Sequence, residues 1–111
     1  MGKLIFVDID GTICQNRDIL RRELDNPNIQ YSDVESFNNR IDKINKLYDE
    51  GNTIIYWTAR GVLSGIDYTE LTKKQLNEWG CKYHELIMNK KPHFDMYICD
   101  KSINADTFFC S

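Results

Sequence analysis

The chain has 111 residues, with 14 lysines and arginines against 17 aspartates and glutamates, and a formal net charge of −3 at pH 7. This length allows one domain, residues 1–111, with a single modest core. The acidic balance argues against nucleic acid or an anionic membrane as the main partner. No apolar stretch approaches the ~20 residues of a membrane span, and no signal peptide is recognisable, so we expect a cytoplasmic protein.

The first predicted element is a buried strand from Leu4 to Val7, which consists of aliphatic and other β-favouring residues. It leads directly into Asp8 and Asp10, which alternate with Ile9. If the pleat of the strand continues, both carboxylates project to one side and Ile9 to the other. Two carboxylates held this close repel each other unless a cation binds between them or one takes up a proton.

The next segment, residues 13–32, lacks a clean hydrophobic period, and we interpret it as a solvated flap over the edge of the sheet. Residues 18–24 within it could form one or two turns of helix. A longer helix is predicted after it, capped by Ser32 or Asp33 and ending before Gly51. Its apolar stripe, at spacings of three and four, contains Val34, Phe37, Ile41, Ile44, Leu47 and Tyr48.

The second half of the chain alternates strands and a helix. A strand is predicted from Thr53 to Trp57, a helix from Tyr68 to Trp79 with Gly80 after it, and further strands from His84 to Met88 and from Phe94 to Cys99. This order predicts an α/β domain, a three-layer, Rossmann-like parallel sheet with flanking helices.

Polar side chains with related chemistry follow the ends of these predicted strands. In a parallel sheet, ligands bind beyond the carboxyl ends of the strands, so these residues are expected to share one site. Carboxylates suit a hard divalent cation, and hydroxyl, guanidinium and ammonium groups suit phosphate oxygens. The residues are Asp8, Asp10, Thr58, Arg60, Asp100 and either Lys90 or Lys91.

These residues match four sequence motifs, in the same order, of the haloacid dehalogenase (HAD) superfamily, and the chain therefore resembles that superfamily. The D-x-D-G-T motif corresponds to Asp8-Ile9-Asp10-Gly11-Thr12, and the Ser or Thr that ends a later strand corresponds to Thr58. The lysine before the last core strand corresponds to Lys91, which Pro92 follows. The acid at the end of that strand, with an acid or Asn after it, corresponds to Asp100 and Asn104.

The resemblance implies a Mg²⁺-dependent phosphatase. Asp8 would be the nucleophile that forms an aspartyl phosphate, and Asp10 the general acid and base. Mg²⁺ would bind to Asp8, to the main-chain carbonyl of Asp10 and to Asp100. Thr58, Lys91 and Arg60 would contact the substrate, with Gly11, Thr12 and Asn104 in supporting positions.

A narrower resemblance rests on four runs: W-T-A-R-G at residues 57–61, L-T-x-K-Q-L-x-E-W-G at 71–80, K-P at 91–92 and Y-I-C-D-K-x-I-N at 97–104. It is to small HAD phosphatases that are associated with capsular or surface polysaccharide biosynthesis. It implies a phosphorylated sugar or glycan precursor as substrate, with nucleotides second. The intervals 13–52 and 61–81 leave no room for a cap domain, so the site is expected to be open, or completed by another subunit of a homo-oligomer. In those relatives the position of Cys99 is commonly Asp, so the thiol removes one carboxylate from the surroundings of the metal.

Two alternatives share these motifs. One is a catalytically silent HAD-fold protein that uses the acidic edge for binding or regulation, and the other is a phosphotransferase with an acceptor other than water. Cys14, Cys81, Cys99 and Cys110 contain no C-x-x-C pair and are interpreted as free thiols. His84 and His93 have no acidic or cysteine partner at metal spacing, so neither is expected to be catalytic.

Overall fold

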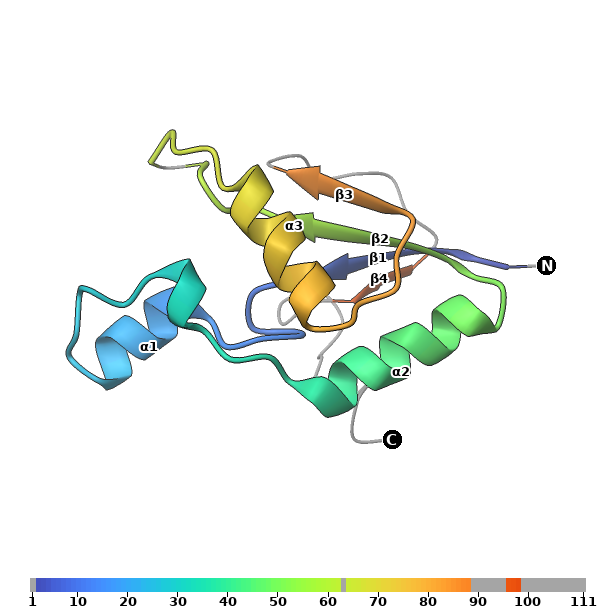
Figure 1. Ribbon diagram of the computed structural model, residues 1–111, viewed down its shortest axis with the longest axis horizontal. Coiled ribbons are helices and arrows are strands. Elements are labelled where there is room, and N and C mark those ends of the chain that lie inside the picture. Colours follow the sequence, from blue (N-terminus) through green and yellow to red (C-terminus); the bar gives the residue numbers. More distant parts are fainter. Residues whose placement is uncertain (1, 63, 89–95, 99–111) are drawn as a thin grey trace.

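The computed structural model describes residues 2–62, 64–88 and 96–98, and Figure 1 shows them around one sheet. The sheet contains β1 (Leu4–Asp8), β2 (Thr53–Thr58), β3 (Glu85–Met88) and β4 (Met96–Ile98). All the pairings are parallel, in the order β3-β2-β1-β4. The carboxyl ends of the strands therefore lie at one edge, and the predicted α/β class with a parallel sheet is confirmed.

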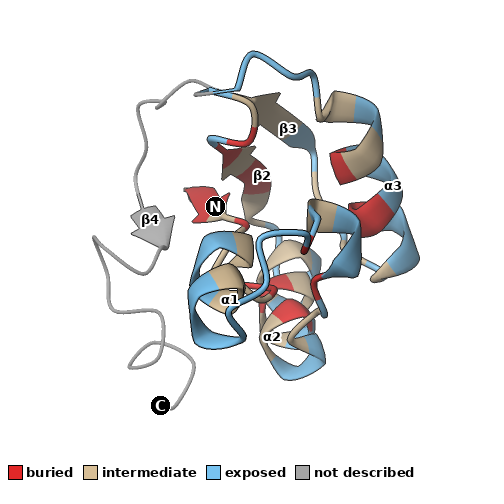
Figure 2. Cartoon of the chain, turned by 90° about the vertical axis from the view of Figure 1, so that its left-hand side faces the viewer, coloured by how far each residue is buried: buried red, intermediate tan, exposed pale blue. Residues whose placement is uncertain are grey.

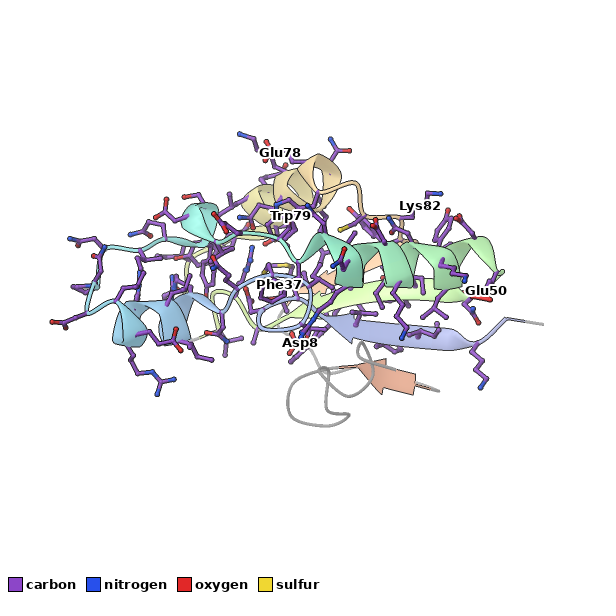
Figure 3. The ribbon with its side chains drawn as sticks, turned by 90° about the horizontal axis from the view of Figure 1, so that it is seen from below. Asp8, Phe37, Glu50, Glu78, Trp79 and Lys82 are labelled. Carbon is purple, nitrogen blue, oxygen red and sulfur yellow. The ribbon has the colours of Figure 1, made fainter. Side chains whose placement is uncertain are left out.

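Two helices cover one face of this sheet, α2 (Asn38–Asp49) and α3 (Thr69–Glu78), as Figures 1 and 3 show. Alternation along β1 and β2 directs one set of side chains to these helices. Phe6 and Ile55 face the opposite side, where Trp57 packs against them. The main core contains Ile5, Val7, Ile9, Ile13, Cys14, Val34, Ile41, Ile44, Ile54, Tyr56 and Leu76. Within the described ranges, α2 and α3 supply one of the two predicted helical layers.

The flap contains α1 (Arg17–Glu23) and a 3₁₀ helix, η1 (Tyr31–Asp33). The side chain of Asn16 caps α1 by accepting hydrogen bonds from the backbone N–H groups of Asp18 and Ile19. Figure 2 shows that α1 is mostly exposed, and none of its residues is buried. The flap is not solvated throughout, because Ile13, Cys14 and Ile29 are buried.

Helix α2 begins later than the sequence predicted, since neither Ser32 nor Asp33 caps it. The carboxylate of Asp33 instead accepts the backbone N–H of Gln30 at 2.8 Å within η1. Residues 34–36 are extended, and Ser36 pairs with Cys14 in an isolated antiparallel bridge. These contacts with the segment after β1 keep residues 34–37 out of the helix, although Val34 still packs into the core.

The later elements agree with the prediction to within one or two residues. Helix α3 turns Thr72, Gln75 and Leu76 inward, and Gly80 follows it with a φ of +72°. Of the predicted strand Phe94 to Cys99, the structure describes Met96–Ile98 as β4. None of the helices in the described part of the chain is both long and apolar enough to cross a bilayer.

Two glycines in the loop after β2 provide a matched test of this fold. Gly61 has a φ of +90°, and an added Cβ would lie 2.1 Å from the carbonyl oxygen of Ile66, whereas Gly65 has a φ of +73° with nothing within 4 Å. Gly65→Ala is expected to lower the free energy of unfolding by about 1 kcal/mol through backbone strain alone. Gly61→Ala should lower the free energy of unfolding by about 3 kcal/mol or more, measured by urea unfolding. Equal losses in the two variants would contradict the close approach of residue 61 to the carbonyl of Ile66.

Candidate active site

The sheet changes its direction of growth next to β1. The chain passes from β1 to β2 and β3 on one side, and β4 then pairs with β1 on the other side, with Val7 beside Ile98. Ligands of open α/β sheets bind outside the carboxyl ends of the strands at such a switch point. Asp8 is the last residue of β1, and Figure 3 shows it at the tip of this strand. The predicted nucleophile is therefore at the position where the topology favours a ligand.

A tight turn follows Asp8 and determines where Asp10 points. The carbonyl of Ile9 accepts hydrogen bonds from the N–H groups of Thr12 and Ile13, at 3.2 and 3.0 Å. Gly11 adopts a φ of +81°, which glycine allows without strain. Ile9 is completely buried, as expected from the alternation, but Asp10 lies beyond β1. The turn rather than the strand pleat therefore places the carboxylate of Asp10.

The carboxylate of Asp10 is held by Thr58, the last residue of β2, and by Arg60, which lies two residues further along the chain. Nη2 of Arg60 lies 2.9 Å from Oδ1 of Asp10, and Nε lies 3.2 Å from each carboxylate oxygen. The hydroxyl of Thr58 donates to Oδ2 at 3.0 Å. The side chain of Arg60 is 0% exposed and that of Asp10 19% exposed. The structure thus brings together Asp10, Thr58 and Arg60, as the sequence predicted.

Helix α3 completes the surroundings of Arg60. Nη1 of Arg60 donates to Oε1 of Gln75 at 2.5 Å and to the hydroxyl of Thr72 at 3.3 Å. Its Nη2 also lies 3.9 Å from Sγ of Cys14. Neither Gln75 nor Thr72 was among the site residues that the sequence predicted. Two polar residues three positions apart on an otherwise buried face were the available signal, because a buried polar group requires a partner.

Tyr31 joins the flap to this site. Two guanidinium groups lie over its ring, with Cζ of Arg17 3.8 Å and Cζ of Arg60 4.5 Å from the ring centre. The main-chain carbonyl of Tyr31 accepts a hydrogen bond from Nε2 of Gln75 at 2.6 Å. The rings of Tyr31 and Tyr68 pack edge to face. Partial burial raises the pKa of Tyr31, so its phenol is neutral at pH 7. The flap is therefore anchored to α3 beside Asp10.

The two cysteines within the described ranges are inert thiols. Burial raises the pKa of Cys14 far above its ordinary value, and the nearby carboxylate of Asp10 raises it further. Burial also raises the pKa of Cys81, to about 11. Because the thiolate is the reactive form, neither group is a nucleophile at neutral pH. The interpretation of both as free thiols is confirmed.

The remaining predicted residues fall into two groups. Thr12 is buried, and its carbonyl accepts a hydrogen bond from Arg40 of α2 at 3.2 Å, which fixes the turn after β1. His84 is structural, since its Nδ1 accepts the N–H of Ile54 at 3.1 Å and its ring stacks on Tyr48. The following residues lie outside the described ranges: Lys90, Lys91, His93, Cys99, Asp100, Asn104 and Cys110.

Two groups here are of the type that a hard cation prefers. One is the carboxylate of Asp8 at the end of β1, whose Oδ1 also accepts the N–H of Ile9 at 2.9 Å, and the other is the main-chain carbonyl of Asp10 in the turn that follows. The carboxylate of Asp10 is instead engaged by Arg60. In the part of the chain that the structure describes, three or more His, Cys, Asp or Glu side chains do not gather around one point. The donor set at β1 has the right chemistry for Mg²⁺ and requires a further acid, such as Asp100.

Comparison with known proteins shows the fold and leaves the family open. No family model matches the chain, and no curated protein matches it. The crystal structure of an MCSG target from Vibrio cholerae is similar, with a TM-score of 0.69 and 22% sequence identity over 100% of this chain and 89% of that one. The chain therefore shares the α/β fold of that protein.

Proposed function

We propose that this protein is a Mg²⁺-dependent phosphomonoesterase of the HAD type that works through an aspartyl phosphate on Asp8. The observation that carries the proposal is the position of Asp8 at the switch point of the sheet. Asp10 lies two residues after it in the sequence, and Arg60 and Thr58 hold the carboxylate of Asp10 in place. A binding site for a cation alone has no need of a second acid oriented in this way. The D-x-D-G-T motif supports the same conclusion.

In the first step, a carboxylate oxygen of Asp8 attacks phosphorus, and the bond from phosphorus to the leaving oxygen breaks. Protonated Asp10 gives its proton to that oxygen, so an alcohol leaves and Asp10 becomes a carboxylate. The described contacts of Asp10, with a guanidinium and a hydroxyl donor, suit this carboxylate form.

In the second step, Asp10 takes a proton from a water molecule, and the resulting hydroxide attacks the phosphorus of the aspartyl phosphate. Asp8 leaves as a carboxylate and inorganic phosphate is released, with Asp10 again protonated. One carboxyl group thus serves as acid and then as base. A rigid position for Asp10 is useful in both steps, because proton transfer requires close and correctly oriented groups.

The phosphoryl group carries negative charge that must be offset. Mg²⁺, when bound by Asp8, the carbonyl of Asp10 and Asp100, supplies positive charge against the repulsion between the nucleophile and the ester. Register supports the inclusion of Asp100, because β4 ends beside β1 and Asp100 follows Ile98 by two positions in the sequence. Lys91 would bind phosphoryl oxygens, and Asn104 would support the metal ligands.

The substrate would be a phosphorylated sugar or glycan precursor. The chain between β1 and α2 forms α1 and η1, and the segment between β2 and α3 is a loop, so the described elements include no separate cap domain over the site. An open site of this kind accepts a protruding substrate, or a second copy of the chain completes it.

Replacement of the two acids tests the reaction. Asp8→Asn is expected to abolish Mg²⁺-dependent hydrolysis of aryl and alkyl phosphates, because the amide is not a nucleophile. Asp10→Asn should lower kcat/KM for an alkyl phosphate by about 10²–10⁴-fold, since an alkoxide leaves poorly without a proton. Phosphate release measures both, and Asp42→Asn, an exposed carboxylate on α2, is the matched control.

Wild-type protein that is inactive across metals and pH would favour the catalytically silent alternative. If the phosphoryl group reaches an added alcohol instead of water, product analysis would identify a phosphotransferase.

The hydroxyl of Thr58 gives a second test. Thr58→Val keeps the volume but removes the donor to Asp10, and we expect a loss of about a hundredfold in kcat/KM, which corresponds to ~3 kcal/mol of transition-state stabilisation. Thr58→Ser retains the hydroxyl and should keep most of the activity. Equal losses in both variants, with unchanged unfolding curves, would show that the hydroxyl has no part in the reaction.

A further inference from the structure

Arg60 was expected to contact the substrate, but the hydrogen-bond geometry leaves it no donor for this purpose. A guanidinium has five N–H donors. The single N–H of Nε is directed to the carboxylate of Asp10. The two on Nη1 have Gln75 and Thr72 as acceptors, and the two on Nη2 have Asp10 and the sulfur of Cys14. A bond to a phosphoryl oxygen would require one of these to break.

Burial leads to the same conclusion. The side chain of Arg60 is 0% exposed, whereas that of Asp10 retains 19% exposure. The ring of Tyr31 lies over the guanidinium, with its centre 4.5 Å from Cζ. A ligand at the carboxyl edge can therefore reach Asp10, while Asp10, Tyr31 and α3 enclose Arg60.

We propose that Arg60 is a positioning residue that orients Asp10 for proton transfer to the leaving group and does not bind the phosphoryl group. This inference rests on the proposed function. Gln75 and Thr72 hold one side of the guanidinium against α3, and the opposite side holds the carboxylate of Asp10. When Asp10 gives its proton to the leaving oxygen, the positive charge of Arg60 stabilises the carboxylate that forms.

A residue that orients Asp10 and a residue that binds the phosphoryl group can be told apart by how the effect of its loss on kcat/KM depends on the leaving group. A nitrophenolate leaves without help from an acid, but an alkoxide requires a proton. Loss of a residue that orients the acid should therefore impair alkyl phosphates selectively, whereas loss of a phosphate ligand should impair both substrates. The ratio kcat/KM reports the steps up to the first irreversible one, so it isolates the attack of Asp8 from the later hydrolysis of the aspartyl phosphate.

The experiment compares Arg60→Gln and Arg60→Lys with wild type, using glycerol phosphate, p-nitrophenyl phosphate and inorganic phosphate as an inhibitor. Arg60→Gln is expected to lower kcat/KM for glycerol phosphate by about thirtyfold or more, and for p-nitrophenyl phosphate by less than about threefold. The inhibition constant of inorganic phosphate should stay within about twofold, since the phosphoryl contacts remain. Arg22→Gln, on the exposed face of α1, is the matched control.

Arg60→Lys retains the charge but cannot span Asp10 and α3 together, so it should give an intermediate, equally selective loss. If Arg60→Gln does not fold, Arg60→Lys and Thr72→Val provide the same comparison, and a selective loss in them supports the inference. Equal losses on both substrates overturn it, and a weaker inhibition by phosphate would then assign Arg60 to substrate binding. An inactive wild-type protein would instead reject the proposed function itself, and this inference with it.

Discussion

The ion pair between buried Arg60 and partly buried Asp10 is the constraint on which the arrangement of this site depends. Removing a charged group from water costs several kcal/mol, and the cost is recovered only if the geometry and the remaining hydrogen bonds are satisfactory. Here the carboxylate meets two guanidinium nitrogens and a hydroxyl, and the guanidinium is also bonded to α3. Because the pair tolerates little displacement, it fixes the end of β1, the end of β2 and α3 relative to one another.

The ion pair also changes the electrostatic argument that the sequence suggested. Two neighbouring acids, Asp8 and Asp10, require a cation or a proton to relieve their repulsion. For Asp10 the protein itself supplies that cation as Arg60. A bound metal ion is thus not needed to explain the second acid, and the case for Mg²⁺ depends on Asp8 and on the acid that follows β4 in the sequence.

Much of the fold could be predicted from the sequence because hydrophobic period and glycine positions determine it locally. The strand from Leu4 and the helix before Trp79 follow directly from such patterns. The start of α2 could not be predicted, because pairing between Ser36 and Cys14 overrides the local capping signal at Asp33. The gathering of Asp10, Thr58 and Arg60 was predictable from strand ends, but the partners of Arg60 depend on how α3 packs.

Neutralisation of Arg60 has a consequence for the binding of phosphate. Its charge is matched by Asp10, and Arg17 is paired with Asp18 at 3.3 Å, so neither contributes much net positive charge to the carboxyl edge. The carboxylate of Asp8 at that edge repels an anionic ester. Under the proposed function, the attraction for phosphate must therefore come from Lys91 and Mg²⁺. Under the same proposal, β1, β2 and α3 position Asp10, whereas Mg²⁺ and Lys91 would compensate the charge of the phosphoryl group.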